Sequence, residues 1–181
     1  MNKTIVVNLF GAPGSGKSTG ASYIFAALKL KGVNAEIATE FAKEKVWEEN
    51  SCVFKCQPYI FGKQVYRLVR LMDKVDVIIT DSPILLCAYY GKNELPSFVW
   101  AVEDTFDEYN NKNYFILRDK PYNPKGRFQT ETESNQVSED LKEFLNKRNI
   151  DYKVIKGSAK GYDEIVNDIM EILNENNPKS E

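Results

Sequence analysis

The sequence predicts an α/β fold built on one five-stranded parallel β-sheet with helices on both faces. Three observations predict it. Strand-like and helix-like segments alternate along the chain, the strand-like segments are almost continuously apolar, and a glycine-rich turn joins the first strand to the first helix. Strands of this kind are buried on both faces, which is typical of parallel sheets. The 181 residues, 43% of them hydrophobic, suffice for one domain with a sizeable core.

The first half of the chain alternates strand and helix patterns. Residues 4–10 (TIVVNLF) form an apolar run that predicts a buried strand, and apolar residues at helical spacing over 16–30 predict the helix that follows. The same patterns predict a short strand, two helices, a second buried strand and a short helix. In that order, these elements span residues 34–39, 40–49, 57–74, 75–81 and 83–90.

The second half continues the alternation up to the end of the domain. Three helices are predicted at residues 97–110, 138–148 and 162–173, and two strands at residues 113–119 and 151–157. Residues 120–135 are polar and contain two prolines and a glycine, which predicts a loop. Residues 1–175 are predicted to form a single domain, and residues 176–181 a frayed tail.

The composition excludes several classes of protein. A net charge of −2 gives no overall field that would attract nucleic acid or an anionic membrane, although it leaves a local basic groove open. No apolar run approaches the ~20 residues of a membrane helix, so we expect a cytoplasmic protein without a membrane partner. The chain has no histidine, so a general base must be a carboxylate, a lysine or a tyrosine. Its three cysteines fit a reducing compartment, and ordinary thiols are favoured over a zinc site.

The glycine-rich turn is the most specific signal in the sequence. Residues 11–18, GAPGSGKS, fit the pattern G-x-x-x-x-G-K-[ST], in which glycines let backbone N–H groups turn toward an anion. The helix that follows adds its unpaired N–H groups and the positive end of its dipole. A plain glycine-rich turn is the alternative, but the pattern arises by chance in roughly one chain per hundred of this size.

Each residue type in this turn has a role in holding a nucleoside triphosphate. Lys17 supplies a positive charge to the β- and γ-phosphate oxygens, the Ser18 hydroxyl is placed to ligate Mg²⁺, and Thr19 adds a contact near the α-phosphate. We therefore predict that ATP is bound by the turn and the start of the helix. These residues are Gly11, Ala12, Pro13, Gly14, Ser15, Gly16, Lys17, Ser18 and Thr19.

Ligands of parallel sheets bind beyond the carboxyl ends of the strands, so the polar residues at those ends are candidates. Asp81 ends an apolar strand, and we predict that it holds the Mg²⁺ shell through water or orients Ser18. The alternative for Asp81 is a helix N-cap, with Pro83 at the first helical position. Glu40 follows another predicted strand, and Arg118 lies at the end of a further one.

The turn alone does not decide what happens to the γ-phosphate. GTPases usually carry an Asn-Lys-x-Asp stretch, which this chain lacks, and motor ATPases usually end an acidic strand with two carboxylates, where this chain has Thr-Asp-Ser-Pro at 80–83. The small size and the single acid favour a kinase of the nucleoside or nucleotide type. A P-loop ATPase or nucleotide-sensing module that acts through a protein partner is the alternative, and it would hydrolyse ATP without an acceptor.

Four stretches, in this order, resemble the P-loop nucleoside and nucleotide kinases: FGAPGSGKST, ATEFAKE, IITDSP and NPKGRFQTE. Over about residues 3–160 the sequence most resembles the nicotinamide riboside kinase-like ATPases, members of which occur in phage genomes, some as base-modification kinases. The resemblance implies the three-layer P-loop NTPase fold with strand order 2-3-1-4-5. It also implies Mg²⁺-ATP-dependent transfer of the γ-phosphate to a hydroxyl of a nucleoside, a nucleotide or a hydroxymethylated base in DNA, and it leaves a homodimer open.

The resemblance also assigns residues to the acceptor side. In similar kinases a carboxylate at the position of Glu40 contacts the acceptor hydroxyl, as base or as anchor; an ordinary acidic residue in the first turn of a helix is the alternative. Gln64 becomes the candidate that reads a base edge, with Phe41, Tyr59 and Arg67 beside it. The alternative for this helix is a core-facing aromatic stripe with a solvated polar face.

Residues 119–136 are predicted to form a lid-like segment. Arg127 lies in its polar loop and is expected to close over ATP and neutralise charge on the transferring phosphoryl group. Arg118 ends the fourth predicted strand and is expected to do similar work. The alternative is a solvent-exposed loop whose charges only keep it soluble.

Overall fold

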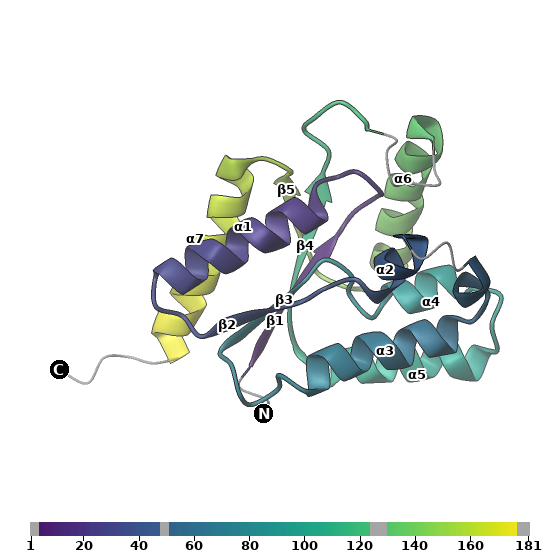
Figure 1. Cartoon of the computed structure of the whole chain (residues 1–181), viewed down its shortest axis with the longest axis horizontal. Helices are drawn as coiled ribbons and strands as arrows, with labels where there is room; N and C mark the ends of the chain where they lie inside the picture. Colours follow the sequence, from purple (N-terminus) through teal and green to yellow (C-terminus); the bar gives the residue numbers. More distant parts are fainter. Residues whose placement is uncertain (1–3, 48–50, 124–129, 177–181) are drawn as a thin grey trace.

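A computed structural model of the chain describes residues 4–47, 51–123 and 130–176 (Figure 1). Five parallel strands form one sheet in the order β2-β3-β1-β4-β5, which confirms the predicted fold class and strand order. The strands are β1 (Ile5–Phe10), β2 (Ala35–Ala38), β3 (Val77–Thr80), β4 (Asn110–Leu117) and β5 (Lys153–Lys156). The helices are α1 (Lys17–Leu30), α2 (Phe41–Trp47), the 3₁₀ helix η1 (Ser51–Lys55), α3 (Gln57–Val69), α4 (Leu86–Tyr90), α5 (Pro96–Asp107), α6 (Glu131–Lys147) and α7 (Ala159–Asn176).

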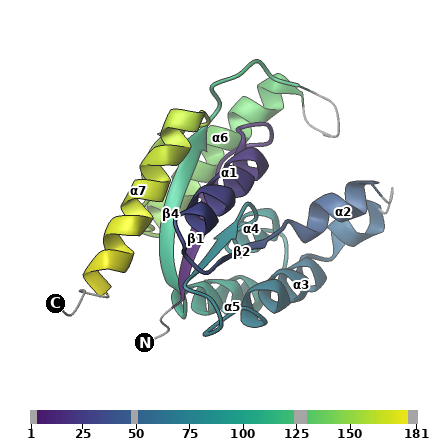
Figure 2. The same ribbon diagram turned by 60° about the vertical axis from the view of Figure 1, so that its left-hand side comes forward.

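Helices cover both faces of the sheet, which gives three layers (Figures 1 and 2). α1 and α7 pack on one face, against Ile5, Val7 and Leu9 of β1. α3, α4, α5 and α6 pack on the other face, against Val6 and Phe10. Because side chains alternate between the faces along a strand, β1 supplies both cores and is buried throughout, which explains its apolar sequence. In the described part of the chain, no helix combines the length and the apolar character that crossing a membrane would require.

β4 begins earlier in the chain than predicted. The predicted helix 97–110 ends at Asp107, and the residues soon after it pair with β1. The buried Asn8 side chain of β1 donates from Nδ2 to Asn111 Oδ1 at 2.8 Å and to Asn113 Oδ1 at 2.9 Å. The polar start of β4 is therefore held by bonds between side chains of neighbouring strands, which helical spacing does not reveal.

α6 also begins earlier than predicted, at Glu131, so the predicted loop 120–135 is wrong at its C-terminal end. The Thr130 side chain accepts a hydrogen bond from the Glu133 N–H at 3.3 Å, and the Glu133 carboxylate accepts one from the Thr130 N–H at 2.6 Å. This capping box satisfies two of the N–H groups that a helix start leaves unpaired. The pKa of Glu133 is lowered, chiefly by the hydrogen bond from the Thr130 backbone N–H and secondly by the bond from the Thr130 hydroxyl.

The carboxyl ends of the strands bring the predicted site residues to one edge of the sheet. β3 pairs with β1 on one side and with β2 on the other. The turn 11–18 follows β1, Asp81 follows β3 and Glu40 follows β2 soon after its last residue. Asp81 therefore lies between the turn and Glu40 along this edge.

Candidate active site

The turn between β1 and α1 has a backbone that glycine adopts most readily. Gly11, Gly14 and Gly16 have φ angles of 141°, 81° and 105°. A Cβ atom on Gly11 would lie 2.6 Å from the carbonyl oxygen of Ile116 in β4. A Cβ atom on Gly16 would lie 2.5 Å from the hydroxyl of Tyr162 in α7. The glycines thus permit both the path of the turn and the close approach of its neighbours.

Lys17, the first residue of α1, folds its side chain back over the turn. Its Nζ donates to the carbonyl oxygens of Gly11, at 2.7 Å, and Ala12, at 3.1 Å. Gly16 caps α1 without a side-chain hydrogen bond, so the positive end of the helix dipole faces the turn. An ammonium has three N–H donors, and its bond to a phosphate anion is stronger than its bond to a neutral carbonyl, so Lys17 is suited to contact a phosphate oxygen at this turn.

Two oxygen atoms at this edge are buried without a hydrogen-bond partner in the part of the chain that the structure describes. They are Ser15 Oγ and Asp81 Oδ1. Asp81 is only 6% exposed, and an unpartnered carboxylate oxygen in such a place is unfavourable unless a ligand or a cation satisfies it. Together with the Ser18 hydroxyl, this carboxylate fits Mg²⁺, which takes one or two protein oxygens and completes its shell with phosphate and water.

The alternative role predicted for Asp81, as a helix cap, is wrong. α4 begins at Leu86, and its N-cap residue is Leu85. Ser82 follows Asp81 in a bend, where its N–H donates to Thr80 Oγ1 at 3.1 Å. Local structure therefore does not account for the Asp81 carboxylate, and its metal-binding role stays a prediction.

Glu40 lies within electrostatic range of Tyr90, at the end of α4. The Tyr90 side chain is 48% exposed, yet its pKa is raised, first by burial of the hydroxyl and then by the charges of Tyr89 and Glu40. The Tyr90 hydroxyl stays protonated at neutral pH, so a hydrogen-bond donor lies within electrostatic range of the Glu40 carboxylate. No pattern in the sequence signals Tyr90.

Gln64 is 2% exposed, and its amide is bonded to the protein itself. Its Oε1 accepts a hydrogen bond from the Phe41 N–H at 3.2 Å. Its Nε2 donates to the Thr39 carbonyl at 3.3 Å and to Thr80 Oγ1 at 3.5 Å. These bonds tie α3 to the segments that follow β2 and to the end of β3. To read a base edge, as predicted, Gln64 has to give up at least one of them.

Arg67 is also bonded to the segment that follows β2. Its Nη1 donates to the carbonyl oxygen of Thr39 at 2.8 Å and to the Thr39 hydroxyl at 2.6 Å, and its Nη2 pairs with Glu44 at 2.6 Å. The guanidinium also lies 5.5 Å from the ring centroid of the buried Phe41. The structure thus brings the predicted residues Phe41 and Arg67 together at the end of β2. There the Arg67 charge is paired with Glu44, and the Phe41 ring is buried.

The tyrosines of α3 lie on its outer surface. Tyr59 is 45% exposed and Tyr66 is 67% exposed, whereas the residues that α3 buries are Ile60, Gln64 and Leu68. The alternative predicted for this helix, a core-facing aromatic stripe with a solvated polar face, is therefore wrong for both tyrosines and for the buried Gln64, whereas Phe61 does pack against the core. Tyr59 also makes an edge-on contact with the Phe41 ring, with 5.6 Å between the centroids, which places it next to the predicted acceptor residues.

Arg118 joins the end of β4 to the first turns of α6. Its Nη1 donates to Glu131 Oε1 at 2.9 Å, its Nη2 donates to Asn135 Oδ1, and its guanidinium lies 5.0 Å from the Tyr122 ring centroid. The charge of Arg118 is thus paired with Glu131 within the protein. Arg127, the other predicted lid residue, lies outside the described residues.

Two side chains that contact the turn were not predicted. Ser134 Oγ donates to the Pro13 carbonyl at 2.7 Å, and the Tyr162 hydroxyl donates to the Gly16 carbonyl at 3.0 Å. The loop between β1 and α1 accordingly lies beside the start of α6 in both ribbon views (Figures 1 and 2). The capping-box pattern at residues 130–133 signals the helix that carries Ser134, whereas no local pattern signals the contact of Tyr162.

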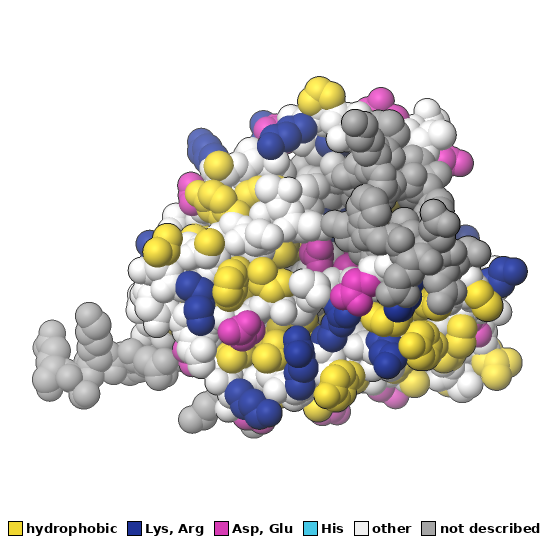
Figure 3. Space-filling view, viewed as in Figure 1, with side chains coloured by type: hydrophobic (Ala, Val, Ile, Leu, Met, Phe, Trp, Pro, Cys, Tyr) yellow, Lys and Arg dark blue, Asp and Glu magenta, His cyan; other side chains and the backbone are white. Residues whose placement is uncertain are grey.

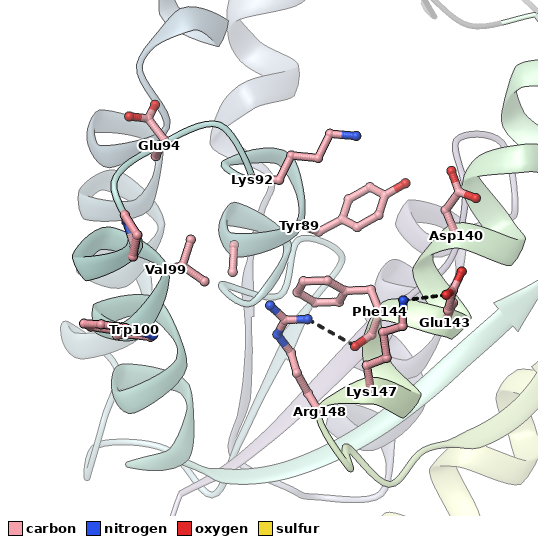
Figure 4. Close-up of a pocket in the computed structure, with 12 residues that line it drawn as sticks. Tyr89, Lys92, Glu94, Val99, Trp100, Asp140, Glu143, Phe144, Lys147 and Arg148 are labelled. Atoms are coloured by element: carbon pink, nitrogen blue, oxygen red, sulfur yellow. Dashed lines mark hydrogen bonds and ion pairs between the residues drawn. The ribbon is translucent and has the colours of Figure 1, made fainter.

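The hollows described on the surface lie away from the turn. One of 470 Å³ lies between α4, α5 and α6, with Tyr89, Trp100 and Phe144 in its lining (Figure 4). In it the Arg148 guanidinium lies 3.8 Å from the Phe144 ring centroid and pairs with Glu103, so its charge is used within the protein. A second hollow, of 800 Å³, lies at the amino ends of β4 and β5. The predicted site residues at the ends of β1, β2, β3 and β4 lie instead at the carboxyl edge of the sheet.

The fold and the turn define the class of this protein. The family model described as an AAA domain matches residues 6–161. Because this match covers well over half of the chain, the chain belongs to this AAA-domain family. No curated protein matches the sequence significantly.

Among solved structures, the chain is similar to that of a deoxyadenosine kinase from M. mycoides with the products dCMP and a flexible dCDP bound. The TM-score is 0.51, and the match covers 94% of this chain and 99% of that chain at 18% identity. At this identity the likeness shows the fold, which is that of the P-loop kinases. The family and the fold together confirm the resemblance to a P-loop nucleoside kinase-like family.

Proposed function

We propose that the chain is a kinase that uses Mg²⁺-ATP and transfers the γ-phosphate to a hydroxyl group of a nucleoside or nucleotide. The observation that carries this proposal is the order of groups along the carboxyl edge of the sheet. The phosphate-binding turn follows β1, Asp81, whose Oδ1 has no hydrogen-bond partner among the described residues, follows β3, and Glu40 follows β2. In-line phosphoryl transfer uses a metal ion bound to the phosphate oxygens and a residue that positions the acceptor hydroxyl, and this order of groups offers both. The likeness in fold to a deoxyadenosine kinase supports a nucleoside-type acceptor.

In this proposal the turn binds the phosphates through backbone N–H groups and Lys17, and Ser18 and Asp81 hold Mg²⁺. When bound, Mg²⁺ neutralises charge on the phosphate oxygens. Glu40 orients the acceptor hydroxyl and accepts its proton late, because the transition state of phosphoryl transfer is loose. The neighbouring Tyr90 hydroxyl donates a hydrogen bond to the same acceptor group.

Two arginines are proposed to stabilise the transferring phosphoryl group. Arg118 does so after its pair with Glu131 opens, and Arg127 acts from the segment between β4 and α6. The acceptor is proposed to lie against the segment that follows β2 and the start of α3. The residues in contact with it are Phe41, Tyr59, Gln64 and Arg67.

The test is an assay for a phosphorylated product. The protein is incubated with Mg²⁺ and γ-labelled ATP together with nucleosides, nucleotides or DNA that carries hydroxymethylated bases. We expect label in at least one acceptor and little release of phosphate without one. Free hydrolysis of ATP with no labelled acceptor in any reaction would contradict the proposal.

Replacement of Glu40 with glutamine is expected to lower kcat with the preferred acceptor by about 10²-fold, because Gln cannot accept the proton of the hydroxyl. The affinity for Mg²⁺-ATP is expected to stay within about twofold, since Glu40 lies on the acceptor side. Steady-state kinetics with each substrate varied in turn measure both effects. Glu36→Gln, the same change within β2, is the control and is expected to behave as the wild type. An unchanged kcat in Glu40→Gln would remove Glu40 from the reaction.

An acceptor base within DNA is the second candidate acceptor, and the surface of α3 favours it. α3 and the residue after it carry Lys63, Arg67 and Arg70 and no acidic residue. Lysine and arginine side chains alternate with hydrophobic ones over this helix in Figure 3, and the Lys63 ammonium lies 5.4 Å from the centroid of the Tyr59 ring. Basic groups interleaved with exposed aromatic rings suit a single nucleic acid strand, through its phosphates and its bases.

Charge reversal on α3 tests this acceptor. The double variant Lys63→Glu, Arg70→Glu is expected to phosphorylate a hydroxymethylated single-stranded oligonucleotide at least tenfold more slowly at low salt. Its rate with the corresponding free nucleotide is expected to be unchanged. Equal rates of wild type and variant on the oligonucleotide would show that α3 does not bind the strand.

A partner-dependent ATPase is the second candidate function, and the description of the family as an AAA domain favours it. It differs from the kinase in one measurable respect, because ATP would be hydrolysed with no small acceptor present. The same labelled-ATP assay separates the two. Label in a nucleoside or base indicates the kinase, and label only in inorganic phosphate indicates the ATPase.

A further inference from the structure

The four residues Ala12–Ser15 of the phosphate-binding turn form a type II β-turn. The Ser15 N–H donates to the Ala12 carbonyl at 3.1 Å, which closes the turn. Pro13 occupies its second position and Gly14, with φ 81°, its third, as this turn type requires. A type I turn joins the same end residues, but its central peptide, between Pro13 and Gly14, is rotated by about half a turn. The two forms therefore point the Gly14 N–H in opposite directions.

Ser134 is bonded to this central peptide. Its Oγ donates to the Pro13 carbonyl at 2.7 Å, and its side chain is fully buried. Because the peptide is planar and trans, its N–H points away from its carbonyl. The bond from Ser134 thus holds the Pro13 carbonyl toward α6 and turns the Gly14 N–H away from α6. In the type I form this bond would be lost, and the buried Ser134 hydroxyl would lose its partner.

The position of Ser134 is itself fixed by the start of α6. The capping box between Thr130 and Glu133 forms the first turn of that helix. Arg118 bonds to Glu131 and to Asn135, on either side of Ser134, and holds this turn against the end of β4. Ser134 therefore offers its hydroxyl from a rigid support rather than from a loop.

A second peptide of the turn is held in the same way from α7. The Gly16 carbonyl accepts a hydrogen bond from the Tyr162 hydroxyl at 3.0 Å as well as the helical bond from the Gly20 N–H at 2.8 Å, and the two bonds together hold the peptide that carries the Lys17 N–H. Tyr162 can approach because two glycines leave room for it. A Cβ atom added to Gly16 would lie 2.5 Å from the hydroxyl oxygen of Tyr162, and a Cβ atom added to Gly20 would lie 2.6 Å from the Cε1 atom of Tyr162.

We propose that Ser134 and Tyr162 are positioning residues that aim the N–H groups of Gly14 and Lys17 at the polyphosphate. Ser134 selects the type II form of the turn, and Tyr162 orients the peptide at the start of α1. The inference rests on the proposed function in one respect, that the turn binds a polyphosphate. It is independent of which acceptor receives the phosphoryl group.

The test compares Ser134→Ala with the wild type by calorimetry and by amide spectra of ¹⁵N-labelled protein. We expect Ser134→Ala to bind Mg²⁺-ADP and pyrophosphate about fivefold to tenfold more weakly, the loss that one hydrogen bond supports. We also expect the change in the Gly14 amide proton shift that pyrophosphate causes in the wild type to be reduced. The control is Ser138→Ala, the same substitution one turn further along α6, which is expected to match the wild type in both measurements.

Tyr162→Phe provides a second, independent variant, because it keeps the ring between the glycines and removes only the hydroxyl. We expect weaker binding of both ligands and a reduced response of the Lys17 amide, with Gly14 little affected. If the amide spectrum of Ser134→Ala shows that α6 has unfolded, the inference is tested by Tyr162→Phe instead. Wild-type affinity and wild-type amide responses in these variants would overturn the inference and leave the proposed function intact. Failure of the wild type to bind either ligand would instead refute the proposed function.

Discussion

Replacement of Lys17 with alanine is expected to lower the rate of phosphoryl transfer by about 10²- to 10³-fold. Lys17 is the cation of the phosphate-binding turn, where its ammonium lies within hydrogen-bond distance of the Gly11 and Ala12 carbonyls. Without it, the charge that develops on the phosphate oxygens loses a positioned partner in the transition state. Initial rates at saturating Mg²⁺-ATP measure the effect on kcat, and calorimetry measures the accompanying loss of nucleotide affinity.

The control for this change lies on the same helix. Lys29 is in the last turn of α1, where its ammonium lies 5.8 Å from the centroid of the Phe25 ring. Lys29→Ala removes the same charge from α1 at the end distant from the turn, so wild-type rates and affinities are expected. A Lys17→Ala protein with wild-type turnover would mean that the turn does not act on the phosphates.

Replacement of Gly11 with alanine is expected to abolish nucleotide binding and to lower the free energy of unfolding by about 3 kcal/mol. Two causes act together. The φ angle of 141° is one that side chains rarely permit, and the new Cβ would lie 2.6 Å from the carbonyl oxygen of Ile116. Because that oxygen belongs to the backbone of β4, it cannot rotate away as a side chain would. Urea unfolding followed by circular dichroism measures the stability, and calorimetry measures the binding.

Two other glycines separate the causes. Gly32 has a φ of 83° but open space around its Cβ position, so Gly32→Ala is expected to cost only the strain, about 1 kcal/mol. Gly62 lies within α3, has no positive φ and also has open space, so Gly62→Ala is expected to stabilise the protein by about 0.5–1 kcal/mol. Neither change is expected to alter nucleotide affinity. If Gly11→Ala were no more damaging than Gly32→Ala, the close contact with β4 would not matter.

The sheet could be predicted from the sequence because its signals are local. The apolar run of β1 indicates burial on both faces, and the glycine-rich turn that follows specifies the fold family and through it the strand order. The start of α6 does not follow from composition, because the prolines and the glycine of the segment before it, together with its polar residues, indicate a loop. The signal that marks the true start, Thr130 with Glu133 three residues later, is equally local. The first turn of that helix contains no apolar residue, so hydrophobic spacing does not indicate a helix there.

The candidate site could be predicted only in part, because several of its contacts join distant segments. The predicted residues that follow the strands do meet at one edge, since parallel strands end together. The sequence cannot show that the Gln64 amide is hydrogen-bonded to the backbone of Phe41 and Thr39, because these bonds depend on how α3 packs across β2. The bond from Ser134 to Pro13 joins residues more than a hundred positions apart and depends on the neighbouring places of β1 and β4 in the sheet.

The central claim, that the turn at residues 11–18 binds a magnesium-bound polyphosphate, is tested most directly by titration calorimetry. Mg²⁺-ATP is added to the wild-type chain and to Lys17→Ala. We expect one binding site per chain in the wild type and at least tenfold weaker binding in the variant. Absence of heat with the wild type, or equal affinity in the two proteins, would contradict the claim.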